Sequence, residues 1–416
     1  MDYKRMLYPA GNSREGTYKF FCGVGVMMLL IYVLIDNLPA LVRRDDAGVG
    51  HYSHYFGKSF YSSHDDDDEP EYVYPGRVKY NYYDGPKEDA CLVMVTKNEE
   101  LYDVLLTVKN VEDRFNLKYN YDWVFVNNIP FSEDFKFVIG EMVTGKVYFS
   151  TIPNKHWDVP AAVDKKKALD ARVQQVSAQV SRAGQLKLRQ LWRYMSGYFH
   201  WDPVFDQYKY YWIIEPDMKL TCDVNYDVFK FMKDNNKQYG FFHSRKTQTA
   251  AVKSLWPAVT EFMSANPEML AQDNMLRFIS DDEGKSYNMC GFESSIEIGS
   301  FEFFRSKEYQ VLFQNLDARN GWFYERWTAS DFRAVAASLL LNKDQLHHFG
   351  DFGYNHKLSK YTMEAVCPLD KQMRLENKCA CNAYNAMSWT SNSCLPKFYD
   401  IQERIKPDRW KGMQAI

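Results

Sequence analysis

The pattern of apolar and polar positions predicts alternating strands and helices from residue 90 onward. A short, continuous apolar run at residues 90–95 is typical of a strand covered on both faces. Apolar side chains then recur at helical spacing over residues 101–115, and a second apolar, aromatic and β-branched run follows at residues 122–126. This strand-helix-strand order predicts a right-handed parallel crossover, in the style of a nucleotide-binding α/β domain.

The segments that follow continue this alternation. We predict a further strand and turn at residues 143–153 and a charged, helix-prone segment at residues 165–198 that lies on the sheet surface. Helical patterns resume at residues 228–235 and 259–263.

Residues 292–301 show the alternation of a half-buried strand. Apolar and small side chains take one face, whereas Glu293 and Glu297 fall on the other. We therefore predict a single strand whose two glutamates share a face, which is either exposed to solvent or lines a polar site.

The aromatic and β-branched run at residues 210–214 predicts a buried strand, and Pro216 should end it. Glu215 and Asp217 then lie at the carboxyl end of that strand, where open α/β sheets place their ligands. Carboxylates there are candidate ligands for a hard divalent cation that bridges phosphates. Two acidic residues in an ordinary turn are the alternative interpretation.

Length and composition narrow the class of protein. At 416 residues, 46% of them hydrophobic, the chain can form one large domain or two ordinary ones. A formal charge of -3 gives no case for nucleic acid as a partner. The many aromatic residues suit either sugar recognition or a well-packed core.

The N-terminal region has the pattern of a single membrane anchor. An uncharged apolar run extends from Phe20 to Ile35, and basic residues precede it. We predict a cytosolic tail at residues 1–19, a transmembrane signal anchor at 20–38, a polar lumenal stem at 39–86 and a catalytic domain at 87–416. This is a single-pass type II topology, and a cleaved signal peptide is the alternative.

Seven of the eight cysteines follow residue 40, which this topology places in an oxidising lumen. Four of them crowd into the C-terminal tail, a spacing that could also hold zinc, and there we favour disulfides. The odd total leaves at least one thiol free or intermolecular. The four tail cysteines are Cys367, Cys379, Cys381 and Cys394.

Several motifs in order along the chain resemble the fungal Golgi α-1,2-mannosyltransferase family, of the glycolipid 2-alpha-mannosyltransferase type. They cover most of the sequence after residue 89, and their order is far more specific than any one of them. The matching stretches are residues 111–116, 123–127, 210–212, 215–219, 222–227, 287–290, 323–327 and 367–370.

The resemblance implies a GT-A-type α/β fold with a mixed, mainly parallel sheet behind a transmembrane helix. It also implies GDP-mannose as donor, Mn²⁺ as cofactor and retention of the anomeric configuration. By position it assigns Glu215 and His356 as metal ligands and Glu297 as the catalytic nucleophile. The substrate-binding residues that we predict are Lys97, Asp217, Glu293, Arg326, Trp327 and Asp331.

This chain also departs from the family pattern. The family usually has Phe-Trp-Ser-Asn-Phe-Glu-Ile where residues 292–298 stand, so Glu293 replaces a tryptophan. The family usually has Gly-Asp-Ala-Pro-Val-His where residues 328–333 stand, so Arg333 takes the place of the last residue of that motif, a histidine. An arginine common two positions before the metal glutamate is Ile213 here. These changes bear on the acceptor and on diphosphate binding.

We therefore interpret the protein as a Golgi membrane enzyme of protein glycosylation that builds the mannoprotein glycans of the cell wall. It would move mannose from GDP-mannose to mannose residues of N- or O-linked glycans. Mannosylphosphate transfer from the same donor is one alternative. A catalytically silent mannan-binding or partner protein is another.

Overall fold

The computed structural model describes residues 85–357 and 363–413. The predicted cytosolic tail and anchor, with nearly all of the predicted stem, lie outside these residues. Within the described ranges, no helix is long and apolar enough to cross a membrane.

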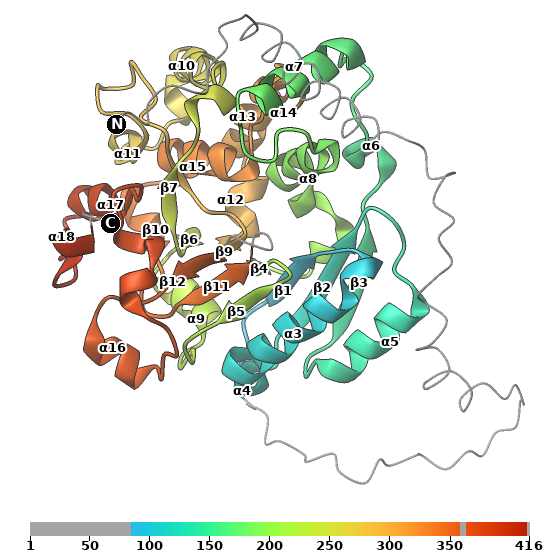
Figure 1. Cartoon of the computed structure of the whole chain (residues 1–416), viewed down its shortest axis with the longest axis vertical. Helices are drawn as coiled ribbons and strands as arrows, with labels where there is room; N and C mark the ends of the chain where they lie inside the picture. Colours follow the sequence, from blue (N-terminus) through green and yellow to red (C-terminus); the bar gives the residue numbers. More distant parts are fainter. Residues whose placement is uncertain (1–84, 358–362, 414–416) are drawn as a thin grey trace, which may run out of the picture. The chain divides into compact units, whose positions relative to one another are not determined.

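A seven-stranded sheet organises the domain, with the strand order β10-β6-β9-β4-β1-β2-β3 (Figure 1). β9 is antiparallel to β4 and β6, while the other pairs are parallel, so the predicted mixed, mainly parallel sheet is confirmed. The strands are β1 (Ala90–Val95), β2 (Asp122–Asn127), β3 (Val147–Thr151), β4 (Tyr210–Ile214), β6 (Tyr239–Phe241), β9 (Ile296–Ser300) and β10 (Leu346–His348).

The predicted opening crossover is present. α3 (Leu101–Val111) connects β1 to β2, and these two strands are parallel neighbours. The helix continues through a π-helical turn at Glu112–Asn116 into α4 (Leu117–Tyr119), so the predicted span of residues 101–115 is confirmed. Its buried face is apolar because side chains at spacings of three and four residues lie on one side of a helix.

Helices cover both faces of the sheet, and each face has its own core. α3, α5 (Glu133–Met142) and α9 (Val228–Asp234) cover one face (Figure 1). The helices over the other face are α8 (Leu186–Gly197), α12 (Phe301–Arg305), α13 (Lys307–Asp317) and α15 (Ala329–Leu340).

Much of the aromatic content belongs to this second core. The ring of Phe199 lies 5.1 Å from that of Tyr211, with Phe301 and Phe304 beside it. The remaining helices are α6 (Asn154–Trp157), α7 (Lys165–Ser177), α10 (Leu255–Ala265), α11 (Leu276–Ile279), α14 (Gly321–Tyr324), α16 (Lys371–Glu376), α17 (Leu395–Ile401) and α18 (Trp410–Met413).

Two predicted elements are divided in the structure. The helical segment predicted at residues 165–198 is α7 and α8, separated by a turn in which Gln179 and Arg182 have positive φ. The strand predicted at residues 292–301 was wrong as a single element. The chain there forms β8 (Cys290–Phe292) and β9, which pair with different partners.

Two small sheets flank the large one. In the first, β11 (Tyr354–Lys357) lies between β5 (Met218–Leu220) and β12 (Met363–Val366), and both pairings are antiparallel. In the second, β7 (Ser244–Lys246) pairs with β8. The first sheet carries His356 and the second carries Arg245.

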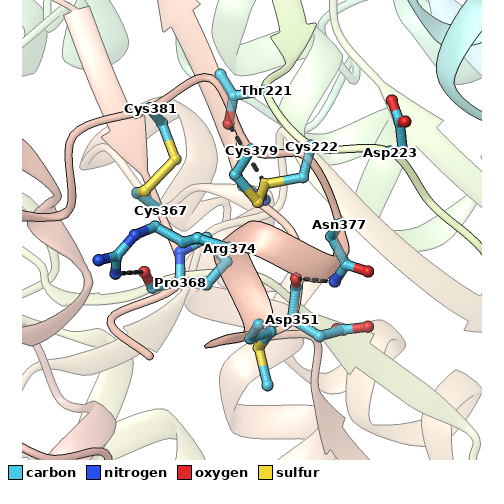
Figure 2. The surroundings of a disulfide bond; sticks show 12 residues. Thr221, Cys222, Asp223, Asp351, Cys367, Pro368, Arg374, Asn377, Cys379 and Cys381 are labelled. Atoms are coloured by element: carbon cyan, nitrogen blue, oxygen red, sulfur yellow. Dashed lines mark hydrogen bonds between the residues drawn. A yellow bond between two sulfur atoms is a disulfide. The ribbon is translucent and has the colours of Figure 1, made fainter. Parts of the chain in front are cut away.

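The preference for disulfides over zinc is confirmed. The bonds are Cys222–Cys379, Cys290–Cys394 and Cys367–Cys381, and Cys91 is a free, buried thiol. The sulfurs of Cys222, Cys379 and Cys381 lie within 4.8 Å of one another, but all three are already bonded to other sulfurs. Figure 2 shows two neighbouring disulfides: Cys222–Cys379 fastens the segment after β5 to the C-terminal tail, and Cys367–Cys381 closes a loop within that tail.

Candidate active site

Polar side chains gather at one edge of the large sheet. Because β1, β2, β4 and β6 are parallel to one another, their carboxyl ends share that edge, and the antiparallel β9 begins there. The backbone N–H of Glu215 donates to the carbonyl of Ser295 at 3.2 Å, which joins the end of β4 to the start of β9. The polar residues along this edge are Lys97, Asn127, Glu215, His243 and Glu293.

Glu215 and His356 meet at this edge although they are far apart in the sequence. The antiparallel pairing of β5 with β11 brings His356 opposite Met218, and its Nε2 lies 3.6 Å from a carboxylate oxygen of Glu215. His356 is 4% exposed, and burial lowers its pKa, so the ring is neutral and keeps a lone pair for a metal. The Glu215 side chain is 42% exposed, yet burial of its carboxyl group raises its pKa to about 7.

This donor set fits a divalent transition-metal ion. A carboxylate and an imidazole are both ligands that Mn²⁺ accepts, and two protein ligands leave other positions for phosphate oxygens and water. Apart from the bonded cysteines, no group of three metal-ligating side chains converges within residues 85–357 and 363–413. A second ligand source, such as the diphosphate of a nucleotide, is therefore needed.

Asp217 lies in the turn between β4 and β5. Its φ of 63° places it in the left-handed region, and its carbonyl accepts from the Lys357 N–H at 3.4 Å. This turn returns the chain alongside β11 and brings Asp217 near His356. The charge of Asp217 raises the pKa of His356, but burial lowers it by more. The structure thus brings Glu215 and His356 within 3.6 Å of each other and places Asp217 in the turn beside them, while their predicted roles stay predictions.

Glu293 belongs to the same site, in the break between β8 and β9. One carboxylate oxygen accepts from the Ser294 N–H at 3.1 Å and from the Ser330 hydroxyl at 3.4 Å, and the other pairs with Arg245. Burial is the largest single influence on Glu293 and raises its pKa, but Arg245, His243 and the Ser295 N–H together outweigh burial and hold the pKa below its usual value. The resulting negative charge is close enough to raise the pKa of Glu215.

Sequence reasoning missed three residues of the site. Glu364 lies directly opposite His356 in the β11–β12 pair and accepts a hydrogen bond from Tyr354 at 2.6 Å. Burial, followed by the charge of Glu293, raises the pKa of Glu364 to about 7. His243 and Arg245 follow β6, and their position after a buried apolar strand is the same signal that identified Glu215.

Glu297 occupies a different place from Glu293. Its carboxylate is fully buried, pairs with Arg333 and accepts from Tyr211 and Tyr239 at 2.8 Å each. Gly299 makes this possible, because a Cβ there would lie 2.5 Å from the Tyr211 hydroxyl oxygen. The two glutamates do not share a strand face, which corrects our prediction. The catalytic role of Glu297 stays a prediction, and this packing offers no exposed atom to a sugar.

The other predicted substrate contacts have varied positions. Lys97 follows β1 and forms a partly exposed ion pair with Glu100 at 3.6 Å, while Arg326 is 8% exposed beside Trp192. Trp327 is 1% exposed in the core and offers no face to a substrate. Asp331 accepts from the backbone N–H and hydroxyl of Thr328, the N-cap of α15, so the two residues form a capping box.

Comparison with known proteins identifies the family. The family model described as "Glycolipid 2-alpha-mannosyltransferase" matches residues 61–403. The chain belongs to this family.

Named relatives and solved structures support this membership. Alpha-1,2 mannosyltransferase KTR1 of Saccharomyces cerevisiae is 42% identical over 81% of this chain and 84% of its own length. Glycolipid 2-alpha-mannosyltransferase 2 of Candida albicans is 40% identical over 79% of this chain and 70% of its own. Core-mannan synthase A from Aspergillus fumigatus, in its Mn/GDP form, has a TM-score of 0.71 at 31% identity, with 78% of this chain and 88% of that chain covered.

The family membership that the sequence motifs predicted is therefore confirmed. Its sheet has the fold of solved glycosyltransferases that bind GDP. The glutamate-histidine pair lies at the edge where this class of sheet binds its ligands.

Proposed function

We propose that the protein is a retaining α-1,2-mannosyltransferase that moves mannose from GDP-mannose to a mannose hydroxyl of a glycoprotein glycan. The observation that carries the proposal is the Glu215–His356 pair at the carboxyl end of β4. Two kinds of comparison support it: relatives named as α-1,2-mannosyltransferases, and a solved structure in a Mn/GDP form.

We assign Mn²⁺ as the cofactor, held by Glu215 and His356. When bound, the ion neutralises charge on the departing diphosphate. The chain supplies a neutral imidazole and a carboxylate, which the ladders of β4 and β11 hold in place. Three carboxylates line the site (Glu215, Glu293 and Glu364), and the guanidinium groups of Arg182 and Arg245 act on Glu215. The carboxylates outnumber these two cations, so a bound cation also balances the charge of the site.

The donor and acceptor have separate places along the sheet edge in this proposal. The β1–β2 end, with Lys97 and Asn127, receives the nucleotide, because the opening crossover forms a nucleotide-binding half. The Asn127 amide nitrogen is buried and has no hydrogen-bond partner among residues 85–357 and 363–413, so it is available to donate to a ligand.

We further propose that the enzyme is a single-pass type II protein of the Golgi membrane, with residues 87–416 in the lumen. Support comes from the basic residues before the apolar run at 20–35 and from the disulfides, which require an oxidising compartment.

One assay tests the proposed reaction. The purified full chain would be incubated with GDP-mannose, Mn²⁺ and a panel of mannosides, and the products analysed by mass and by NMR of the anomeric proton. We expect a product heavier by one mannose, with an α-1,2 linkage and GDP release. A product heavier by mannose plus phosphate would establish mannosylphosphate transfer instead. Absence of GDP release with every acceptor would leave a binding role.

Glu215→Ala is the matched control in that assay. It should abolish the Mn²⁺-dependent part of GDP binding, because the diphosphate loses its bridging ion. Unchanged GDP affinity by calorimetry in Mn²⁺ would remove Glu215 from the metal site.

A further inference from the structure

Buried polar atoms without partners cluster beside the Glu215–His356 pair. His243 is 1% exposed, and neither ring nitrogen has a hydrogen-bond partner among the described residues. Ser295 is 5% exposed, and its hydroxyl likewise has none. Because buried polar groups are almost always satisfied, unpartnered ones in one place indicate that a ligand or ordered water supplies the missing bonds.

The backbone holds these groups close to the metal pair. The N–H of Glu293 donates to the His243 carbonyl at 3.0 Å, and the N–H of Ser295 donates to the Glu293 carboxylate at 3.4 Å. The Ser295 carbonyl in turn accepts from the N–H of Glu215. The cluster is therefore connected to the metal ligand by successive hydrogen bonds.

The strand order places the cluster on the side away from the nucleotide. Along the sheet edge the sequence of strands is β6, β9, β4, β1, β2, with Glu215 at the end of β4. His243 follows β6 and Glu293 precedes β9, whereas Lys97 follows β1 and Asn127 ends β2. If the cation holds the diphosphate at the end of β4, the transferred mannose points toward β6 and β9, and the acceptor that receives it binds on that side.

We propose that His243, Arg245 and Glu293 form the acceptor subsite, which binds hydroxyl groups of the mannose that receives the new bond. This inference rests on the proposed function, since it names the residues that select the acceptor of that same reaction.

The chemistry of the cluster fits a neutral polyhydroxyl ligand. Glu293 accepts hydrogen bonds, the 40%-exposed Arg245 side chain donates them, and a neutral histidine does both. Glu293 and Glu364 oppose an anionic acceptor, because a second negative charge would meet theirs. Arg245 is fixed by Glu293 on one side, which pre-organises its guanidinium for a sugar hydroxyl.

Kinetics of three variants of the full chain test this subsite. Glu293→Gln keeps the side-chain shape, Arg245→Met removes the donor, and Lys246→Met alters an exposed neighbour on the same strand as the control. At saturating Mn²⁺ we expect the first two to raise the acceptor KM at least ~10-fold, the loss of about one hydrogen bond to a charged group, and to change the GDP-mannose KM much less. Lys246→Met should leave both KM values unchanged.

Deoxymannosides as acceptors provide a second measurement. Discrimination against one particular analogue would not change if Glu293 and Arg245 only stabilised the fold. The native protein should discriminate strongly against the analogue that lacks the hydroxyl bound by Glu293, because that analogue leaves the buried carboxylate without one of its hydrogen bonds. Glu293→Gln should narrow this discrimination for that analogue alone. If discrimination and acceptor KM are unchanged in both variants, the subsite assignment is wrong.

The failure of this inference can be told apart from failure of the proposed function. Donor hydrolysis and Mn²⁺-dependent GDP binding report on the function, and acceptor kinetics report on the subsite. Intact donor turnover with unchanged acceptor kinetics overturns only the subsite, and a native protein without donor turnover overturns both. If Glu293→Gln does not fold, the double variant Glu293→Met/Arg245→Met removes the buried pair together and is measured in its place.

Discussion

Arg333 of α15 and Glu297 of β9 form an ion pair that is closed to solvent, with 1% and 0% of their side-chain surfaces accessible. The guanidinium also donates to the Met195 carbonyl at 2.7 Å and lies over the rings of Phe199 and Phe304. Removing one partner of such a pair leaves an uncompensated buried charge, which costs about 3–5 kcal/mol.

Ile213 lies directly opposite Glu297 in the β4–β9 pair. The family resemblance places an arginine at this position, and here the positive charge comes from α15 instead. We expect Arg333→Met to lower the free energy of unfolding by about 3–5 kcal/mol. Ile213→Arg should recover part of that loss in the same chain, since cross-strand neighbours are about 5 Å apart at Cβ.

A double-mutant cycle by denaturant unfolding measures this exchange. Ile213→Arg alone is the control and should destabilise, because it brings a second cation to Arg333. If the effects of Arg333→Met and Ile213→Arg on the free energy of unfolding are strictly additive, an arginine at position 213 does not replace the charge of Arg333.

The catalytic role predicted for Glu297 needs a test that separates it from this packing. We expect Glu297→Gln to lower stability and to reduce transfer at least ~100-fold. Glu297→Gln/Arg333→Met removes both charges and should regain stability. If Glu297 acts in the reaction, transfer stays low in this folded double variant, and a native transfer rate there would limit Glu297 to holding Arg333.

The parts of the fold that could be predicted from sequence are those in which local pattern and burial agree. β1, α3, β2 and β4 have long apolar runs or one apolar helix face, and the chain folds accordingly. The β8–β9 region failed because alternation continues through the break at Glu293, while the pairing partners change from β7 to β4 and β6. Partner choice is a long-range property that a local alternation does not contain.

The residues of the site also differ in whether a local pattern or a long-range strand pairing places them there. Glu215 was predicted because it directly follows a buried strand, which is a local signal. His356 came only from the family resemblance, and Glu364 was missed, since both reach the site through antiparallel register with distant segments. Glu293 lies at the same sheet edge as Glu215, but in the break between β8 and β9 and not within the single strand that we predicted.

His200 gives a prediction about pH. Burial, followed by the charges of Arg333 and Arg305, holds its pKa well below the usual value, so it is neutral in the folded chain. The unfolded chain binds a proton below about pH 6.5, so this histidine stabilises the fold less as the pH falls. We expect a loss of about 2 kcal/mol between pH 7 and pH 5 from this residue.

The difference between His200→Gln and the native chain isolates that contribution. Buried carboxyls with raised pKa values, such as Glu364, act in the opposite direction in the native protein but cancel in the comparison. The variant should therefore gain stability relative to the native chain as the pH falls. Parallel pH profiles would show that His200 does not titrate on unfolding.

The predicted membrane topology can be checked with tags on the two ends of the chain. Lys4, Arg5, Arg14 and Lys19 precede the apolar run and favour a cytosolic N-terminus. In intact Golgi vesicles, protease should remove an N-terminal tag and spare a C-terminal one until detergent is added. The reverse pattern would exclude a type II anchor.

The Cys222–Cys379 disulfide should affect metal binding as well as stability. Cys222, bonded to Cys379 (Figure 2), follows β5, which pairs with the strand that carries His356. The Thr221 N–H donates to the Gly353 carbonyl at 2.8 Å, just before that strand. We expect Cys222→Ser/Cys379→Ser to cost roughly 3–5 kcal/mol of stability. It should also weaken Mn²⁺-dependent GDP binding, because β11 loses part of its support.

The Cys290–Cys394 bond provides the matched control. It closes a segment of 104 residues against 157 for Cys222–Cys379, so chain entropy alone predicts losses that differ by only roughly 0.4 kcal/mol. Cys290 begins β8, which carries neither metal ligand. Its removal should therefore lower stability to a similar extent and leave the GDP affinity in Mn²⁺ unchanged, as calorimetry on both folded variants would measure. Equal weakening of GDP binding in the two variants would mean that general loosening of the fold, and not support of His356 by β5, governs the metal site.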